Sequence, residues 1–309
     1  MNDENLSTVI IANRNQIAQA KAIFNDRFPI IHGQDSQNTK ILIRESYKSG
    51  TRRFIVLGGD GTVNCLANAL IEDAQSLDPS IKIIVLGGGT GNDYIRSLRQ
   101  RFGLDPFQKV IPSNQINNCQ FVSVDVGRIT FDTFSSIDPK IFINMFGPGF
   151  SGKVVQDRNR LPALVPKSLS YSLPSAKSLL FFKPRLIKLS SDGLPKFEGK
   201  SFGLFISKGR FAGGGMVLGA NAILDDGLFD ITLIPQLSFF KLAKGLSLAV
   251  GGRPPEIPGA LRFKASSLEI ESLECPWEVE TDGEYLGQAS SMTVELLPKM
   301  LSMSTAAQA

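Results

Sequence analysis

The chain has 309 residues, of which 42% are hydrophobic and 20% are charged. At about 100–200 residues per domain, this length predicts roughly two domains with packed cores, and the charged fraction is too low for a disordered chain. Lysine and arginine number 33 against 29 aspartates and glutamates, a net charge of +4. This mild excess suits nucleotide phosphates or a membrane surface as a partner, and it argues against a nucleic-acid-binding protein.

The chain contains one histidine and three cysteines, which excludes several kinds of active site. A zinc site with two or three imidazoles cannot form in one chain, and a Ser-His-Asp triad would have to use His32 without a Gly-x-Ser-x-Gly turn. The widely spaced Cys65, Cys119 and Cys275 indicate buried thiols rather than disulfides or a metal cluster. Because residues 1–7 are polar and acidic and no apolar run approaches about 18–20 residues, we expect a cytoplasmic protein.

In the first third of the chain, short apolar runs alternate with segments of helical periodicity. The predicted strands are 8–12, 30–32, 54–57 and 81–86, and the predicted helices are 14–26, 38–48, 62–74 and one that begins at residue 93. Strands separated by helices of this length predict a parallel sheet with right-handed crossovers.

After about residue 119 the pattern changes to short strands divided by Gly, Pro, Asp and Ser. The predicted strands are 121–126, 141–146, 186–189, 202–207, 229–234, 267–270, 277–281 and 291–297, with a helix or two within 161–182. This pattern is typical of antiparallel sheets and predicts a β-sandwich. We therefore expect an α/β domain over 1–118, to which 292–309 can return, and a β-sandwich domain over 119–291.

Two glycine-rich segments follow neighbouring strands of the predicted parallel sheet. The first, residues 58–64, reads Gly-Gly-Asp-Gly-Thr-Val-Asn, and the second, residues 87–93, reads Gly-Gly-Gly-Thr-Gly-Asn-Asp. Glycines let backbone N–H groups approach a phosphate, and the helix that follows each loop adds partial positive charge. Both loops should lie at the carboxyl edge of the sheet, which predicts a nucleotide cleft; Asp60 fits there if magnesium bridges it to the phosphates.

These motifs resemble the diacylglycerol kinase catalytic family, which includes bacterial soluble lipid kinases and sphingoid-base kinases. Residues 58–64 match its Gly-Gly-Asp-Gly-Thr-x-Asn loop and residues 89–93 its Gly-Thr-Gly-Asn-Asp loop. Residues 213–215 with 222–230 are similar to its glycine cluster and Asp-Asp-Gly segment, and residues 280–284 to its Asp-Gly-Glu segment. The resemblance covers nearly the whole chain and implies an α/β nucleotide domain followed by a β-sandwich.

The resemblance also implies roles for particular residues. Those expected to bind ATP are Asn13, Gly58, Gly59, Asp60, Gly61, Thr62, Asn64, Gly89, Thr90, Gly91, Asn92 and Asp93. A carboxylate of the Asp-Gly-Glu segment would take the proton of the lipid hydroxyl; the sequence does not choose between Asp282 and Glu284, although we favour Glu284, and Asp60 would assist. A structural Mg²⁺ would be held by the side chain of Asp226 and the carbonyl oxygens of Ile223 and Leu228.

Several of these segments also have ordinary structural explanations. Asp-Gly between two strand-like runs is a strong hairpin signal, and Asp225–Asp226 can be a polar connection between strands. Basic residues follow the second glycine loop (Arg96, Arg99, Arg101) and flank residues 179–182 (Lys177, Lys183, Arg185, Lys188). They predict either a solvated basic face or a surface that docks on anionic lipid headgroups.

Three departures from the family pattern bear on nucleotide binding. Only Asn13 remains of the expected Asn-Pro-x-Ser-Gly turn, where the chain reads Asn-Arg-Asn-Gln. His32, Gly33 and Gln34 stand where a nucleotide-contacting threonine is expected, and the proline usual before the Asp-Asp-Gly segment is missing from residues 219–222.

The sequence therefore predicts an ATP- and Mg²⁺-dependent kinase that phosphorylates a lipid hydroxyl and is peripherally associated with the membrane. The sequence leaves the oligomeric state open, and the family resemblance makes a homodimer one option. An NAD kinase-like enzyme with a soluble substrate is one alternative, since such enzymes share the first glycine loop. A catalytically inactive lipid-binding protein is the other, because the first turn has diverged.

Overall fold

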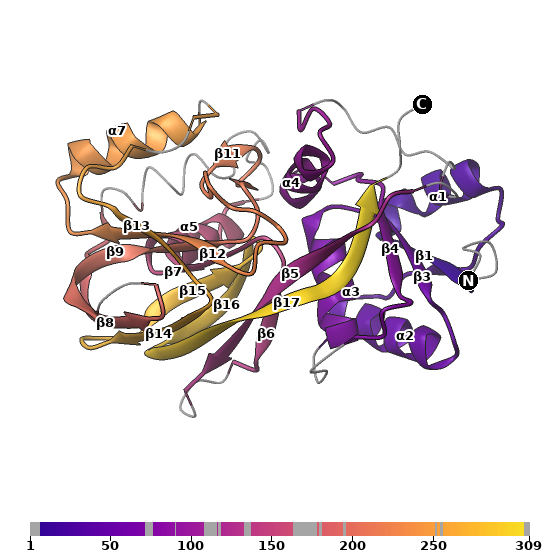
Figure 1. The fold of residues 1–309 in the computed structure, drawn as a ribbon, viewed down its shortest axis with the longest axis horizontal. Helices are drawn as coiled ribbons and strands as arrows, with labels where there is room; N and C mark the ends of the chain where they lie inside the picture. Colours follow the sequence, from indigo (N-terminus) through magenta and orange to yellow (C-terminus); the bar gives the residue numbers. More distant parts are fainter. Residues whose placement is uncertain are drawn as a thin grey trace.

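The structure of the protein, a computed structural model, describes residues 7–71, 77–89, 91–107, 116, 119–132, 137–162, 178, 181–193, 196–250, 252–253 and 256–305. The first part of the chain forms a parallel sheet covered by helices (Figure 1). Its strands are β1 (Thr8–Ala12), β2 (Ile30–Ile31), β3 (Arg53–Leu57) and β4 (Lys82–Val85). Its helices are the 3-10 turn η2 (Arg14–Gln16), α1 (Ile17–Phe24), α2 (Ser36–Lys48), α3 (Asp60–Ile71) and α4 (Asp93–Arg101).

The strands of this sheet are apolar on both faces, which explains why helices cover both sides. The order is β4-β3-β1-β2, and each neighbouring pair is parallel. Ile10 and Ile55 pack with Ala20 and Phe24 of α1 in one apolar cluster. The alternate strand residues, such as Ile11 and Val56, pack with Ile43 of α2 and Leu66 of α3 in another.

The second part of the chain is mainly antiparallel. Its strands are β5 (Val122–Phe131), β6 (Lys140–Phe142), β7 (Met145–Pro148), β8 (Arg185–Ser191), β9 (Phe197–Ser207), β10 (Phe211–Ala212), β11 (Met216–Val217), β12 (Phe229–Pro235), β13 (Leu261–Ala265), β14 (Ser267–Ser272), β15 (Trp277–Thr281), β16 (Glu284–Ala289) and β17 (Ser291–Thr305). The long strand β9 pairs with β8 through its first half and with β12 through its second half. The apolar side chains of these strands pack mainly in two clusters: one contains the fully buried Trp277, and the other contains Phe202 and Phe205 of β9 together with Phe150.

Two long strands connect the two parts of the chain. β17 begins beside β14, runs antiparallel to β5 and ends parallel to β4. In Figure 1, β5 and the yellow β17 cross from the antiparallel part to the parallel sheet. The last strand of the chain thereby ends beside β4, the strand that leads into the second glycine loop.

The structure confirms the predicted fold class, a parallel α/β part followed by an antiparallel, sandwich-like part. The predicted strand 141–146 is wrong as one element, because residues 143–144 interrupt it and divide it into β6 and β7. Two helices of the second part were not predicted, α5 (Phe150–Asn159) and α7 (Phe239–Val250).

Most of the segment 161–182, where we expected a helix or two, lies outside the described residues. The division at residue 118 stays a prediction. Within the described ranges, none of the helices has both the length and the apolar character needed to cross a bilayer.

Candidate functional site

The two glycine loops lie against each other at the carboxyl edge of the parallel sheet. β3 leads into the first loop and then α3, and its parallel neighbour β4 leads into the second loop and then α4. The approach is backbone to backbone, because a Cβ atom placed on Gly59 would lie 2.9 Å from Cα of Gly89. Only glycine allows this spacing at both positions. Of the loop residues expected to bind ATP, Thr90 lies outside the described residues.

Asp60 connects the first loop to the helix that follows the second. Its two carboxylate oxygens accept the backbone N–H groups of Asp93 and Tyr94, both at 2.9 Å, so Asp60 caps the N-terminus of α4 from another element. Burial, together with the nearby charges of Asp93 and Asp282, raises the pKa of Asp60 to about 6. The crowding of carboxylates here is the environment that a cation bound with nucleotide phosphates would stabilise.

The second glycine loop is held by its own polar residues and by the glycine cluster of the antiparallel part. Asn92, in the left-handed conformation with φ 55°, accepts the N–H of Gly89 at 2.9 Å through Oδ1. Asp93 accepts the N–H of Gly214 at 2.7 Å through Oδ2. Its other oxygen, Oδ1, accepts a hydrogen bond from Arg96 at 2.7 Å. The structure thus brings together the second loop and the later glycine cluster.

The basic residues after this loop do not form a free basic face. Arg96 pairs with Asp93, Arg101 pairs with Asp225, and Arg99 is 1% exposed and donates to the carbonyl of Asp105. These contacts account for the three arginines within the fold, and their docking on lipid headgroups stays a prediction. Lys177 lies outside the described residues.

A buried amide network joins helix α3 to the antiparallel part. Asn64 donates to Asp282 Oδ2 at 2.6 Å and to the carbonyl of Ile141 at 3.1 Å. One turn later, Asn68 accepts the N–H of Ile141 at 3.0 Å and donates to its carbonyl at 2.8 Å. The side-chain amide of Asn64, which the resemblance assigns to nucleotide binding, is thus engaged in contacts between the two parts of the chain.

The carboxylate of Asp282 receives four hydrogen bonds. Besides Asn64, the N–H groups of Ile143, Asn144 and Met145 donate to it at 2.8–2.9 Å. Burial raises the pKa of Asp282, and these donors oppose that rise. Four donors occupy the lone pairs that a general base would use, so the geometry fits Asp282 as an anchor better than as a proton acceptor.

Glu284 lies two residues further along and is the exposed carboxylate of this turn. Burial lowers the pKa of Lys40 on α2 and raises the pKa of Cys65 on α3, and the charge of Glu284 acts to raise both. Its exposure, against the four hydrogen bonds that Asp282 accepts, favours Glu284 as the group that could take a proton from a substrate.

Sequence reasoning missed a third carboxylate of the same segment, Glu280, which is 1% exposed. It accepts the hydroxyl of Ser151 at 2.7 Å and the N–H of Gly283 at 3.0 Å. Burial raises the pKa of Glu280 to about 7, although the hydrogen bonds from Ser151 and Gly283 act to lower it. The sequence offered one signal for Glu280, an acidic residue within a strand that is otherwise buried.

The diverged first turn lies directly beneath the second glycine loop. Asn13 caps η2 by accepting the N–H of Asn15 at 3.1 Å. Gln16 is buried and donates through Nε2 to the carbonyl of Gly88. At the position of the family's phosphate turn, the side chain of Gln16 therefore supports the second glycine loop.

The predicted magnesium site at Asp226 does not fit the structure. The oxygens assigned to the metal, Asp226 Oδ1 and the carbonyl of Leu228, accept hydrogen bonds from the ammonium group of Lys208 at 3.1 and 2.9 Å. Ile223, whose carbonyl oxygen was the third expected ligand, is 47% exposed as a residue. Burial alone would raise the pKa of Asp226, but Lys264 and Lys208 hold it below its usual value. In the part of the chain that the structure describes, no three His, Cys, Asp or Glu side chains gather as metal ligands.

Comparisons with known proteins agree with this architecture. Residues 11–129 match the diacylglycerol kinase catalytic domain, and residues 145–305 match the YegS C-terminal NAD kinase beta sandwich-like domain. A relative from Xanthomonas euvesicatoria pathovar vesicatoria, named "Probable lipid kinase YegS-like", is 29% identical over 84% of this chain and 81% of its own length. "Probable lipid kinase YegS" from Escherichia fergusonii is 26% identical over 94% of this chain and 91% of its own length.

A crystal structure described as a diacylglycerol kinase from Bacillus anthracis strain Sterne has the same fold. It superposes with a TM-score of 0.66 at 21% identity and covers 96% of both chains. The order of the two matched domains, together with the two glycine loops on one edge, defines a kinase of the diacylglycerol kinase type. Within that class, the chain belongs to the family whose second half is the YegS C-terminal domain.

Replacing Gly59 by alanine should force the two glycine loops apart. The added Cβ atom would lie 2.9 Å from Gly89 Cα, which is backbone and cannot rotate away. We expect a lower melting temperature and a smaller rise of it on addition of Mg-ATP, measured by differential scanning fluorimetry. Gly61→Ala is the packing control, because nothing lies within 4 Å of its added Cβ, so its melting temperature should not fall. Equal melting temperatures of Gly59→Ala and wild type would contradict the close approach.

Glu280→Gln should change how stability depends on pH. Because the pKa of Glu280 rises from 4.5 to about 7 on folding, its contribution to stability is full below pH 4.5 and is lost as the pH rises toward 7. The variant is neutral at every pH, so the free energy of unfolding of wild type minus that of the variant should fall between pH 5 and 7.5. Urea titrations across this range measure it, with the exposed Glu271→Gln as control. A constant difference would show that Glu280 ionises normally.

Proposed function

We propose that this kinase transfers the γ-phosphate of ATP, with Mg²⁺, to the hydroxyl group of a lipid such as diacylglycerol. In this proposal residues 1–118, with the strand end at 292–309, bind the nucleotide, and residues 119–291 bind the lipid. The relatives are named "Probable lipid kinase", and these names support a lipid as the class of substrate. The parallel sheet with its paired glycine loops supports the nucleotide, since backbone N–H groups and two helix N-termini face one edge.

The observation that carries the proposal is the hydrogen bond between Asn64 and Asp282, at 2.6 Å. Asn64 lies in the first turn of α3, directly after the first glycine loop, and Asp282 belongs to the turn that presents Glu284. The contact holds the expected phosphate site and an exposed carboxylate in a fixed relation. A phosphoryl acceptor and its base must be aligned with the phosphate in this way, because such catalysis rests mainly on positioning and on charge neutralisation.

The chemistry assigned to each residue follows from this arrangement. The lipid oxygen attacks the γ-phosphorus, the bond from that phosphorus to the bridging oxygen of ADP breaks, and Glu284 takes the hydroxyl proton. The N–H groups of the loop around Gly59 and the α3 N-terminus hold the phosphates. Mg²⁺ bound with the nucleotide supplies neutralising charge to the phosphates, and the carboxylate of Asp60 is the group placed to hold it.

A membrane surface is part of the proposal, because the substrate resides there. Phe181 and Phe240 are 74% and 80% exposed. Their near neighbours Phe182 and Leu242 belong to the same apolar cluster of the antiparallel part. The exposed Lys183, Lys241 and Lys244 adjoin them, a combination that suits anionic lipid headgroups. Leu179 and Leu180, which we expected at this surface, lie outside the described residues.

One observation favours the alternative of a lipid-binding protein that does not transfer phosphate. The side chain of Gln16 meets the second glycine loop at Gly88, where the family pattern predicts a phosphate-binding turn. If this side chain blocks the phosphates, ATP binding is lost while the lipid-binding part stays intact. Calorimetry with ATP and Mg²⁺ separates the two candidates before any substrate is known.

The central test is transfer of labelled phosphate from Mg-ATP to a panel of lipids in mixed micelles. The panel contains diacylglycerol, a sphingoid base, ceramide, phosphatidylglycerol and an isoprenoid alcohol, with NAD and fructose 6-phosphate as soluble controls. We expect one labelled, organic-extractable product. Glu284→Gln should lower the rate by about 10²–10⁴, because it removes the base. Glu271→Gln, an exposed carboxylate on β14, should keep the wild-type rate.

Three outcomes would count against this function. Label on NAD or the sugar would replace the lipid with a soluble acceptor. A wild-type rate in Glu284→Gln would remove the assigned base. The absence of any product together with the absence of ATP binding would establish the inactive alternative.

Membrane docking should depend on the two exposed phenylalanines. We expect Phe181→Ser and Phe240→Ser each to reduce co-sedimentation with vesicles of phosphatidylcholine and 30% phosphatidylglycerol, since each loses a large apolar side chain from the interface. Ile41→Ser is the matched control, because Ile41 is a 43% exposed apolar residue on α2, in the parallel part of the chain. Unchanged sedimentation of both variants would remove this surface from the proposal.

A further inference from the structure

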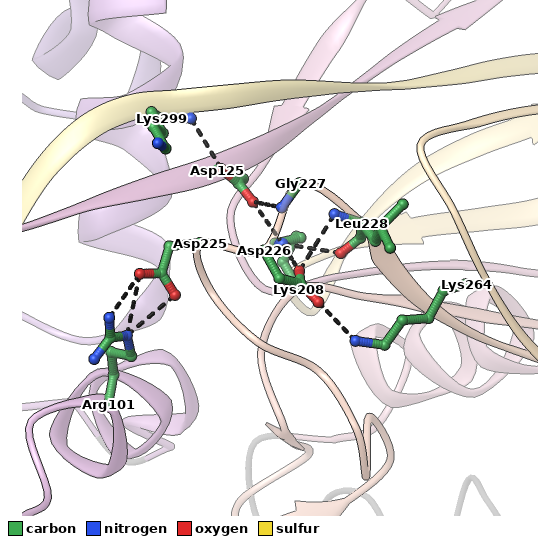
Figure 2. A network of polar contacts seen from close by, with 9 residues as sticks. All are labelled: Arg101, Asp125, Lys208, Asp225, Asp226, Gly227, Leu228, Lys264 and Lys299. Carbon is green, nitrogen blue, oxygen red and sulfur yellow. Dashed lines mark hydrogen bonds and ion pairs between the residues drawn. The ribbon is translucent and has the colours of Figure 1, made fainter.

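A buried lysine contacts two of the three oxygens that the family resemblance assigns to a structural cation, those of Asp226 and Leu228. The Nζ atom of Lys208, directly after β9, lies 2.8 Å from Asp125 Oδ2, 2.9 Å from the carbonyl of Leu228 and 3.1 Å from Asp226 Oδ1. Figure 2 shows these contacts converging on the ammonium group. An ammonium group has three hydrogen-bond donors and no acceptor, so these three oxygens saturate it.

The cluster is electrically balanced without a metal ion. Its carboxylates are those of Asp125 and Asp226, and its ammonium groups are those of Lys208 and Lys264, which lies 2.6 Å from Asp226 Oδ2. Lys208 is 0% exposed and Asp125 is 1% exposed, and charges buried to this degree persist in proteins when they are paired. A divalent cation on the same oxygens would add two positive charges beside an ammonium group that cannot leave for solvent.

The carboxylates of the cluster also fix the surrounding backbone by hydrogen bonds and ion pairs, as a bound metal ion would by coordination. Asp125, on β5, accepts the N–H of Gly227 through Oδ2 at 2.8 Å and the N–H of Lys299, on β17, through Oδ1 at 2.9 Å. Asp225 pairs with Arg101 at the end of α4, 2.8 Å away. The loop of residues 224–228 is thereby fixed between the two connecting strands and the helix after the second glycine loop (Figure 2).

We propose that the ammonium group of Lys208 takes the position and the structural role of a divalent cation in this chain, so that the loop of residues 224–228 folds without magnesium. The proposal concerns folding and does not rest on the proposed kinase reaction. Lys208 belongs to none of the motifs that carry the family resemblance, which is why the sequence alone predicts a metal here.

The test compares melting temperatures in EDTA and in millimolar MgCl₂, without nucleotide. Wild type should melt at the same temperature in both and should contain no bound divalent metal after purification. Lys208→Asn should melt about 10 °C lower in EDTA, because it leaves a buried carboxylate without its partner. Magnesium should restore much of that loss in a concentration-dependent way, because the vacated oxygens then bind it.

Lys264→Asn is the matched control, since it removes a second lysine from the same carboxylate. Its side chain is 34% exposed, so its melting temperature should fall less, and magnesium should not restore it while Lys208 remains. A wild-type protein that retains one divalent ion, or that EDTA destabilises, would overturn the proposal even if Lys208→Asn fails to fold. A Lys208→Asn variant as stable as wild type in EDTA, or one destabilised without rescue by magnesium, would overturn it as well.

Discussion

The relation between the two parts of the molecule depends on the carboxylate of Asp282. It lies in a left-handed conformation, φ 49°, which costs a residue with a side chain on the order of 1 kcal/mol, and its four hydrogen bonds offset that cost. Three of the donors are consecutive backbone N–H groups at the start of β7, and the fourth is Asn64 on α3. A single side chain therefore fixes the strand entry, the helix after the first glycine loop and the turn that presents Glu284.

The same kind of contact, in which a carboxylate accepts backbone N–H groups of another element, recurs where the two parts meet. Asp60 accepts backbone N–H groups of α4, Asp93 that of Gly214, and Asp125 those of Gly227 and Lys299. In each case a carboxylate from one element holds the backbone of another, and charge-assisted hydrogen bonds of this kind are stronger than neutral ones. The loops at the junction contain many glycines, and these carboxylates hold their backbone by hydrogen bonds in addition to apolar packing such as that of Leu224.

The sequence predicted the framework because local patterns determine it. The apolar runs that became β1 and β15 were predicted with their observed bounds, and the glycine loops were placed on one edge from the order of strands and helices alone. Of the two missed helices, α5 lacks such a pattern. It contains Gly152, Val154 and Val155, which favour other structures, and it forms where Gly152 lets the helix pack against the carbonyl of Glu278 on β15. α7 has an amphipathic pattern, with Lys241 and Lys244 exposed and Leu242 buried, and we overlooked it in the sequence.

The site was predicted less completely than the fold, because a motif names residues and not their neighbours. The Asp-Gly-Glu segment was identified, but the roles of its carboxylates depend on their surroundings. Asp282 accepts hydrogen bonds from several donors, Glu280 lies in a buried strand, and Glu284 is exposed to solvent. Asp226 was identified equally well, but the sequence did not indicate that Lys208 lies 3.1 Å from its carboxylate, at the oxygens expected to bind a metal. A buried carboxylate can pair with a metal ion or with a cationic side chain. Buried charges must be balanced by opposite charges within a few ångströms. The cation at such a site is therefore determined by side chains distant in the sequence, and an acidic motif is compatible with either a metal ion or a lysine.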